Sequence, residues 1–106
     1  MAEHNQPLFA QLLRGGLIVS CQSSEGDAFH SPALMARFAQ AAHDGGAVGI
    51  RANGPEDIAA IRAAVPLPVI GIQKRMMEDG RVLITPTLED ARALVAAGAT
   101  AIALDC

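Results

Sequence analysis

The 106-residue sequence contains no tryptophan, no tyrosine and only three phenylalanines, and its eight basic residues are outnumbered by eleven acidic ones. Nucleic-acid-binding proteins rely on basic surfaces and on aromatic rings that stack on bases. Because this chain has neither, we expect no RNA or DNA partner. It also lacks any apolar run near the ~20 residues that a membrane-spanning helix requires, so we expect no membrane association.

Cysteine is nearly absent as well, with Cys21 inside an apolar run and Cys106 at the last position. Two cysteines do not make the disulfide framework of a small secreted domain. The first residues also lack the basic and then apolar pattern of a secretory signal, so a reduced, cytoplasmic setting is expected. The histidines His4, His30 and His43 show no metal-ligand spacing, and we expect no metal site.

What the sequence does contain is an alternation of short apolar runs with longer stretches of helical period, and 51% of its residues are apolar. This pattern is typical of parallel strands joined by crossover helices in one α/β domain. The predicted strands are residues 17–21, 47–50, 69–72 and 101–104.

The predicted helices begin at cap or proline signals and end at glycine or proline. One runs from Ser31–Pro32 to Gly45, a second from Gly54–Pro55 to Pro66, and a third from Thr87 to Gly98. A short helix over 8–13 precedes the first strand. Residues 76–84 interrupt the repeat, with a tight turn at 78–80 and a short extra strand over 81–84.

Two architectures use such units: an open doubly wound sheet and a closed (β/α)8 barrel. The length favours the open sheet, because a full barrel needs about 250 residues. The sequence instead reaches Asp105–Cys106 directly after the fourth predicted strand, without a covering helix. This ending favours a barrel cut after four strands, which would leave strand edges able to pair with another chain.

Polar side chains follow all four predicted strands. They are Gln22, Arg51, Lys74 and Asp105. In both architectures ligands bind at the carboxyl edge of the strands, so these four residues are the candidate site. Each also has an ordinary alternative: Gln22 as the start of a loop, Arg51 in an ion pair, and Asp105 as a cap.

Lys74 is distinct because the other seven basic residues are all arginines. Arginine does not lose its proton near neutral pH, whereas a lysine desolvated beside another cation can act as a base. Lys74 is therefore the candidate acid/base residue, the alternative being an ordinary charge at the rim. Cys21 has no histidine at an equivalent strand end to activate it, so we expect it to be a core residue.

Five stretches of the chain occur in the order found in one known family, and by these the sequence resembles the bacterial N-acetylmannosamine-6-phosphate 2-epimerases of sialic acid breakdown. The stretches are residues 14–22, 45–51, 68–75, 84–90 and 103–105. The resemblance implies a TIM (β/α)8 barrel with parallel strands. Residues 1–106 would be its N-terminal half, a single partial domain with the first four strand–helix units.

The resemblance also implies the chemistry, which is removal and return of the C2 proton that interconverts N-acetylmannosamine 6-phosphate and N-acetylglucosamine 6-phosphate. Lys74 matches the catalytic lysine of the family, while Gln22 and Arg51 match its substrate-binding residues. Asp105 matches an aspartate of the fourth strand. No cofactor is implied, since an acid and a base suffice.

The family's second acid/base residue, a glutamate, and its phosphate-binding loops belong to later strands, which this sequence does not include. We therefore expect a truncated chain with little or no epimerase activity by itself. Two other functions remain open. One is a non-catalytic half-barrel that pairs with its own copy or with a second half-barrel, and the other is a small open-sheet domain that binds a phosphorylated ligand.

Overall fold

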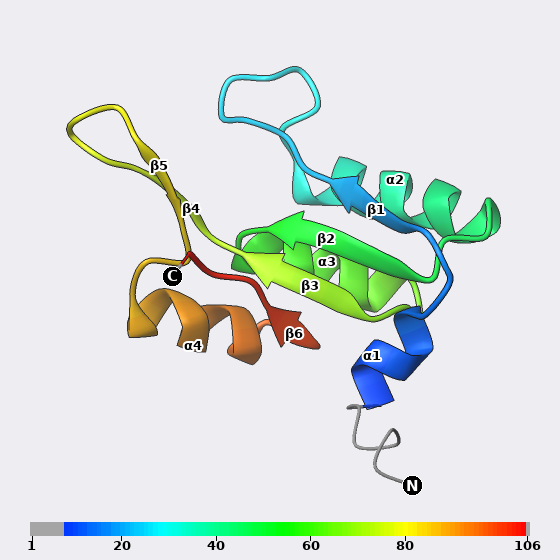
Figure 1. The fold of residues 1–106 in the computed structure, drawn as a ribbon. Helices are drawn as coiled ribbons and strands as arrows, with labels where there is room; N and C mark the ends of the chain where they lie inside the picture. Colours follow the sequence, from blue (N-terminus) through cyan, green and yellow to red (C-terminus); the bar gives the residue numbers. More distant parts are fainter. Residues whose placement is uncertain (1–7, 106) are drawn as a thin grey trace, which may run out of the picture.

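The structure of the chain, a computed structural model, describes residues 8–105, so the expectations about His4 and Cys106 lie outside the described residues. Helices and strands alternate along it as the sequence pattern predicts (Figure 1). The order is α1 (Leu8–Leu13), β1 (Ile18–Cys21), α2 (Pro32–Asp44), β2 (Gly49–Asn53), α3 (Pro55–Ala64), β3 (Val69–Ile72), β4 (Lys74–Met76), β5 (Val82–Ile84), α4 (Leu88–Ala96) and β6 (Ala101–Ile102).

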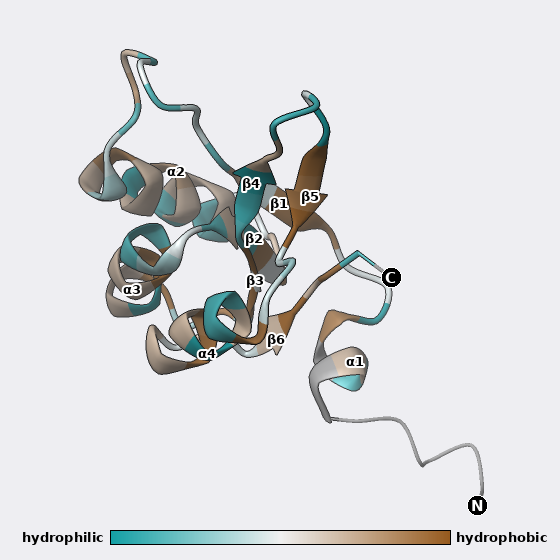
Figure 2. Cartoon of the chain, turned by 90° about the vertical axis from the view of Figure 1, so that its left-hand side faces the viewer, coloured by the Kyte–Doolittle hydropathy of each residue, from teal (hydrophilic) through white to brown (hydrophobic). Residues whose placement is uncertain are grey.

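Four strands form one parallel sheet in the order β1-β2-β3-β6, which is also their order along the chain. The helices α2, α3 and α4 all lie along one face of this sheet (Figures 1 and 2). A doubly wound sheet would carry helices on both faces and would reverse its strand order. The described chain is therefore wound in one direction, as in a barrel.

The hydrophobic core lies between the sheet and these three helices. Along β2 the residues alternate, so that Ile50 and Ala52 are fully buried under the helices while Arg51 and Asn53 are only partly buried. Alternation arises because successive side chains of a strand point to opposite faces. Among residues 8–105, the other face of the sheet carries no long helix, and the short α1 lies on that side, below the strands in Figure 2.

Local signals in the sequence set the helix boundaries. Ser31 accepts a hydrogen bond from the Leu34 N–H at the start of α2, and Thr87 accepts one from the Asp90 N–H at the start of α4. These side chains satisfy backbone donors that the first turn of a helix leaves unpaired. Pro66 and Pro68 follow the end of α3, where they prevent its continuation.

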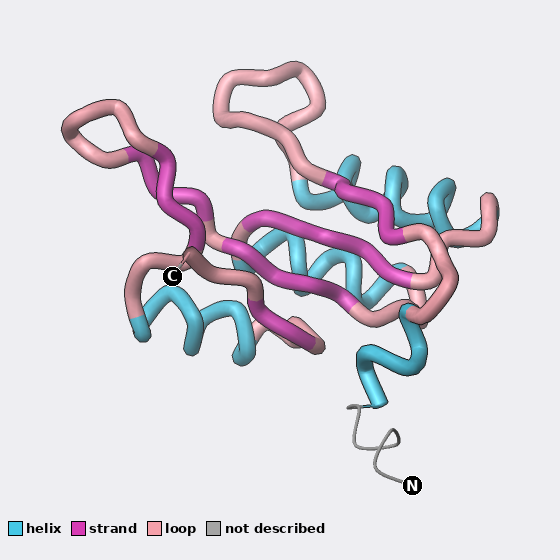
Figure 3. The backbone as a smooth tube through the Cα atoms, viewed as in Figure 1, coloured by secondary structure: helices cyan, strands magenta, loops and turns pink. Residues whose placement is uncertain are grey.

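The interruption of the repeat is a β-hairpin in which β4 and β5 pair antiparallel and project beyond β3 (Figure 3). The predicted extra strand is confirmed as β5, although its partner, β4, was not predicted. Strand boundaries also differ from the prediction. β2 is displaced towards the C-terminus and continues to Asn53, which still pairs with Ile72 at the end of β3. The Gly54 N–H donates to the Ile72 carbonyl, and Asn53 Oδ1 accepts a hydrogen bond from the Lys74 N–H.

Three of the four candidate residues therefore do not directly follow a strand of the sheet. Arg51 lies inside β2, and Lys74 opens β4 two residues after the end of β3. Gln22 directly follows β1, as predicted, whereas Asp105 comes three residues after the short β6. Among residues 8–105 no helix is long and apolar enough to cross a lipid bilayer.

The contact between β3 and the helices leaves no room for a side chain at Gly71. A methyl group there would lie 2.8 Å from Ile58 Cδ1 and 3.0 Å from Ala99 Cβ. We expect Gly71→Ala to lower the free energy of unfolding by about 1–3 kcal/mol, the usual cost of overpacking a core.

Urea unfolding followed by circular dichroism measures this change. Gly45→Ala is the matched control, since Gly45 has a helical φ of −80° and an added methyl group would meet only ordinary contacts. That substitution is expected to leave stability unchanged or to raise it by about 0.4–1 kcal/mol. Equal unfolding midpoints for the two variants would contradict the packing described here.

Candidate functional site

The carboxyl ends of β1, β2 and β3 share one edge of the sheet, and the β4–β5 hairpin continues from it. Loops at this edge position the ligand-binding residues of parallel α/β folds. The candidate residues Gln22, Arg51, Lys74 and Asp105 all belong to this edge or to the hairpin beside it.

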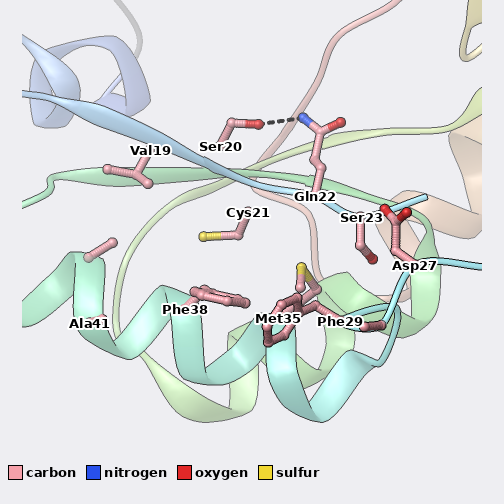
Figure 4. Close-up of a pocket in the computed structure, with 12 residues that line it drawn as sticks. Val19, Ser20, Cys21, Gln22, Ser23, Asp27, Phe29, Met35, Phe38 and Ala41 are labelled. Atoms are coloured by element: carbon pink, nitrogen blue, oxygen red, sulfur yellow. Dashed lines mark hydrogen bonds between the residues drawn. The ribbon is translucent and has the colours of Figure 1, made fainter.

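Arg51 and Gln22 share the face of the sheet that the helices do not cover. Arg51 lies opposite Ser20 in the parallel register between β1 and β2. The Gln22 Nε2 group donates a hydrogen bond to Ser20 Oγ at 2.6 Å. Figure 4 shows Ser20 and Gln22 on the side of β1 that faces away from α2, while Cys21 lies on the α2 side. The structure therefore brings the amide of Gln22 close to the β2 strand that carries Arg51.

The other polar atom of Gln22, its Oε1, is buried and has no hydrogen-bond partner among the described residues. A buried acceptor without a partner is uncommon in folded proteins, because it costs the hydration of that atom. Among the described residues, this carbonyl oxygen is the one buried side-chain polar atom left without a partner.

Lys74 is fixed to the sheet through its backbone. Its N–H donates to Asn53 Oδ1 at 2.9 Å, and Lys74 pairs with Ile84 across the hairpin. The next residue, Arg75, binds Asp90 of α4. Since successive side chains of a strand point to opposite faces, the Lys74 side chain points away from α4. It is exposed to solvent in the described chain.

Asp105 is held against the same hairpin residue. Its Oδ2 accepts a hydrogen bond from the Ile84 N–H at 2.8 Å, and its own N–H donates to the Ile84 carbonyl at 3.0 Å. One residue, Ile84, therefore connects the backbone of Lys74 with both the backbone and the carboxylate of Asp105. This backbone N–H lies 21 residues before Asp105 in the chain, so the contact is not the cap of a following turn that the sequence left open.

An ion pair fastens the hairpin to α4. Arg75 Nη2 donates to Asp90 Oδ1 at 2.7 Å and Arg75 Nε donates to Asp90 Oδ2 at 3.3 Å, which makes a two-point contact. The Arg75 hydrogen bonds lower the pKa of Asp90 from its ordinary value, and the Thr87 side chain lowers it further. Bidentate pairs of this kind hold both orientation and distance. The pair therefore orients β4, the strand that carries Lys74.

On the helix side of β1 an apolar groove of about 690 Å³ opens between β1 and α2. Its wall includes Phe29 and Phe38, whose rings meet edge to face with their centres 5.8 Å apart. Cys21 lies at its base, buried as expected, and burial raises the pKa of its thiol. A protonated, buried thiol is a poor nucleophile, and this groove offers no activated group.

A second, smaller pocket of about 260 Å³ surrounds the start of α3, and its wall includes Asn53, Gln73, His30 and Asp57. Burial raises the pKa of the Asp57 carboxyl, an effect that the neighbouring His30 opposes. Among the described residues, no group of three or more His, Cys, Asp or Glu side chains is placed to hold a metal ion.

Two residues at the edge were not recognised in the sequence, Asn53 and Thr85. Asn53 binds the backbone of Lys74, and Thr85 binds the backbone of Gln73 next to it. The Asn53–Gly54 pair, which begins three residues after the apolar run over 47–50, is a local signal that marks a strand end. For Thr85 the signal is weaker, because only the following proline restricts its backbone.

The sequence profile described as "Putative N-acetylmannosamine-6-phosphate epimerase" matches residues 35–106. The chain is 53% identical over 95 residues to a "Putative N-acetylmannosamine-6-phosphate 2-epimerase" of Caldanaerobacter subterraneus and 53% identical over 93 residues to a protein of the same description from Clostridioides difficile. The chain belongs to this epimerase family.

A solved structure of the N-acetylmannosamine-6-phosphate 2-epimerase from Clostridium perfringens is similar to this epimerase-family chain with a TM-score of 0.85 and 40% identity. The match covers 96% of this chain and 44% of that protein. It confirms the fold expected from the sequence, strand–helix units of a (β/α)8 barrel. The chain spans 40% and 42% of the length of the two sequence relatives, and aligned residues cover 90% and 88% of it.

The Arg75–Asp90 ion pair predicts a dependence of stability on pH. The pKa of Asp90 is lower in the folded chain than its ordinary value of 3.8, so its stabilising contribution is fully present above pH 3.8 and is lost as the pH falls through the folded-state pKa. We expect Asp90→Asn to lower the free energy of unfolding at pH 7 by about 1–3 kcal/mol, the range for hydrogen bonds to charged groups.

Urea unfolding of both proteins at pH 7 and at pH 3 measures this effect, and the difference between them should shrink at the lower pH. Asp79→Asn is the matched control, because Asp79 also binds an arginine, Arg81, but at the exposed turn of the hairpin. Exposed pairs contribute about 0–1 kcal/mol. An Asp90→Asn effect that is no larger than the Asp79→Asn effect would contradict the assignment.

Proposed function

We propose that this chain carries the base-bearing part of a site that interconverts N-acetylmannosamine 6-phosphate and N-acetylglucosamine 6-phosphate in N-acetylneuraminate (sialic acid) catabolism. In this proposal residues 1–106 are the N-terminal half of the barrel, and an amino-sugar phosphate is the substrate. The observation that carries it is a continuous series of contacts along the carboxyl edge. Gln22 binds Ser20 beside Arg51, Asn53 binds Lys74, and Ile84 joins Lys74 to Asp105.

The chemistry requires a base beside the C2–H bond of the open-chain sugar, where C2 adjoins the C1 aldehyde. In the proposed step the neutral amine of Lys74 takes the C2 proton onto Nζ. The electron pair of the C–H bond forms the C1–C2 double bond, and the carbonyl oxygen takes the negative charge. Return of a proton to the other face of C2 gives the epimer. A positioned base contributes roughly 10²–10⁴-fold to such a step.

The remaining residues have binding roles in this proposal. The Arg51 guanidinium is cationic at all working pH values and stabilises the negative oxygen that develops at C1. The partnerless Oε1 of Gln22 accepts a hydrogen bond from a sugar hydroxyl or from the acetamido N–H. Asp105, fixed by the Ile84 N–H, offers its second oxygen to another hydroxyl. No cofactor is required, because acid–base chemistry suffices.

Deuterium exchange tests the proposed base directly. The chain is incubated with N-acetylmannosamine 6-phosphate in heavy water, and loss of the C2 proton signal is followed by NMR. We expect exchange that falls at least 100-fold in Lys74→Ala and in Lys74→Arg, because arginine keeps the charge but does not release its proton. Epimer is expected to form more slowly than deuterium enters, since the resemblance gives the second acid/base role to a glutamate absent from this sequence.

Arg81→Ala is the control, since Arg81 is a cation of the same hairpin whose side chain binds Asp79 at the turn. It should exchange at the wild-type rate. Equal rates for wild type and Lys74→Arg, or no exchange by the folded wild-type chain, would show that Lys74 is not the base of a working site in this chain.

A second candidate function is a non-catalytic half-barrel that assembles with its own copy or with a separate second half-barrel. The observation that favours it is the exposure of apolar side chains at both ends of the sheet. Phe38 of α2 beside β1 is 46% exposed and Val95 of α4 beside β6 is 59% exposed. Among the described residues, the outer edges of β1 and β6 pair with no strand. Unpaired edges and apolar surface together promote association.

Sedimentation equilibrium tests this candidate. We expect the average mass to rise with concentration from 11.0 kDa towards twice that value. Phe38→Glu should weaken association at least tenfold, because it places a charge in the apolar end surface. Gln40→Glu, an exposed position on the same helix, adds the same charge and should leave association unchanged. A monomer at every concentration would rule out self-assembly.

A further inference from the structure

Thr85 combines two features that rarely occur together in one residue. It is 5% exposed, and its φ is +50°, which makes it the one non-glycine residue with positive φ among the described residues. A β-branched side chain in this region is an outlier, since the conformation is unfavourable for it. Strain of this kind persists only where surrounding contacts hold it, and it is concentrated at functional sites.

The contacts that hold Thr85 join the segments that follow two neighbouring strands, β3 and β6. Its Oγ1 accepts a hydrogen bond from the Gln73 N–H at 3.2 Å and donates one to the Ala103 carbonyl at 2.7 Å. Its own N–H donates to the Gln73 carbonyl at 2.7 Å. The hydroxyl is therefore fully engaged, once as acceptor and once as donor. It spans from the residue after β3 to the residue after β6.

The preceding residue, Ile84, contacts Lys74 and Asp105, which lie just beyond the two partners of Thr85 in the sequence. It pairs with Lys74 in the hairpin and exchanges two hydrogen bonds with Asp105. The dipeptide Ile84–Thr85, which we term the bridge, thus connects Gln73–Lys74 with Ala103 and Asp105. The hydrogen bonds that Ile84 makes with Asp105 use its backbone, so the Thr85 hydroxyl is the side-chain hydrogen-bonding group of the bridge.

We propose that Thr85 is a positioning residue that sets the distance and orientation between Lys74 and Asp105. This inference rests on the proposed function, in which both residues meet the sugar. Thr85 reaches neither residue directly but fixes the backbone next to Lys74 and two residues before Asp105. Removal of its hydroxyl deprives the partly buried Gln73 N–H and Ala103 carbonyl of this partner, which loosens both segments. Loss of alignment by such small displacements slows catalysis more than it weakens binding.

Thr100 provides a matched control for the hydroxyl. Its Oγ1 accepts a hydrogen bond from the Val69 N–H at 3.0 Å, at the opposite, amino end of β3. Replacement of either threonine by valine therefore removes a hydroxyl that binds the backbone of β3 (Val69) or of the residue directly after it (Gln73). Only Thr85 lies at the carboxyl edge. A purely structural role would give the two substitutions similar consequences.

The experiment compares wild type with Thr85→Val, Thr85→Ser and Thr100→Val. Amide hydrogen exchange by NMR is the first readout and needs no activity. We expect exchange at Lys74 and Asp105 to rise at least tenfold in Thr85→Val and to stay within threefold of wild type in Thr85→Ser and Thr100→Val. Protection of the Leu94 amide, in the core helix α4, reports that each variant is folded.

The second readout is C2 deuterium exchange at increasing concentrations of N-acetylmannosamine 6-phosphate. We expect the maximal rate of Thr85→Val to fall at least tenfold with a half-saturating concentration within threefold of wild type, and Thr85→Ser to restore the rate. If Thr85→Val does not fold, Thr85→Gly replaces it, because glycine adopts positive φ freely and still lacks the hydroxyl. The same losses are expected for it.

The two readouts distinguish a failure of the proposed function from a failure of the positioning role of Thr85. A folded wild-type chain without C2 exchange would refute the proposed function, while the amide measurements would still decide whether Thr85 holds the two segments. Amide exchange at Lys74 and Asp105 that is equal in Thr85→Val and Thr100→Val would overturn the positioning role. So would a maximal C2 exchange rate in Thr85→Val or Thr85→Gly within twofold of an active wild type.

Discussion

The burial of one face of the parallel sheet under α2, α3 and α4 is the constraint on which the rest of this structure depends. It requires apolar residues at alternate positions of each strand, such as Ile50 and Ala52 in β2. Because the period of a strand is two, the intervening positions must face the other side. Arg51 and Asn53 occupy those positions. The same packing that stabilises the fold therefore also directs the candidate site residues away from the helices.

The β4–β5 hairpin carries a further candidate residue, Lys74, outside the parallel sheet. Hydrogen bonds that involve Asn53, Thr85 and Asp105 fasten the start and end of the hairpin to β2 and to the segment after β6, while the Arg75–Asp90 pair fastens it to α4. A short two-stranded hairpin has little stability alone. Here the two ends of the hairpin are held from several sides, so Lys74 lies on a strand fixed by several contacts, as its proposed role as a base requires.

The sequence was sufficient for much of the architecture, because helix caps, prolines and apolar runs act locally. The cap at Thr87 and the stop at Pro66 are examples, and each helix follows from signals within a few residues. The position of Arg51 inside β2 was not foreseen, since the end of that strand is set by bonds to β3 and Lys74, which are distant in the sequence. Thr85 was missed for the same reason. Its partners Gln73 and Ala103 are 12 and 18 residues away, and no local pattern encodes them.

Exposure connects the two candidate functions. Lys74 is open to solvent among the described residues, and water weakens both the action of a neighbouring cation on an amine and the stabilisation of a developing oxyanion. A second half-barrel, or a second copy, that paired with the free edges of β1 and β6 would cover the inner face of the sheet and lower the local dielectric constant around Arg51 and Lys74. Assembly and proton abstraction are then not independent alternatives. Pairing driven by apolar ends such as Phe38 and Val95 would itself supply the environment that the lysine needs to act as a base.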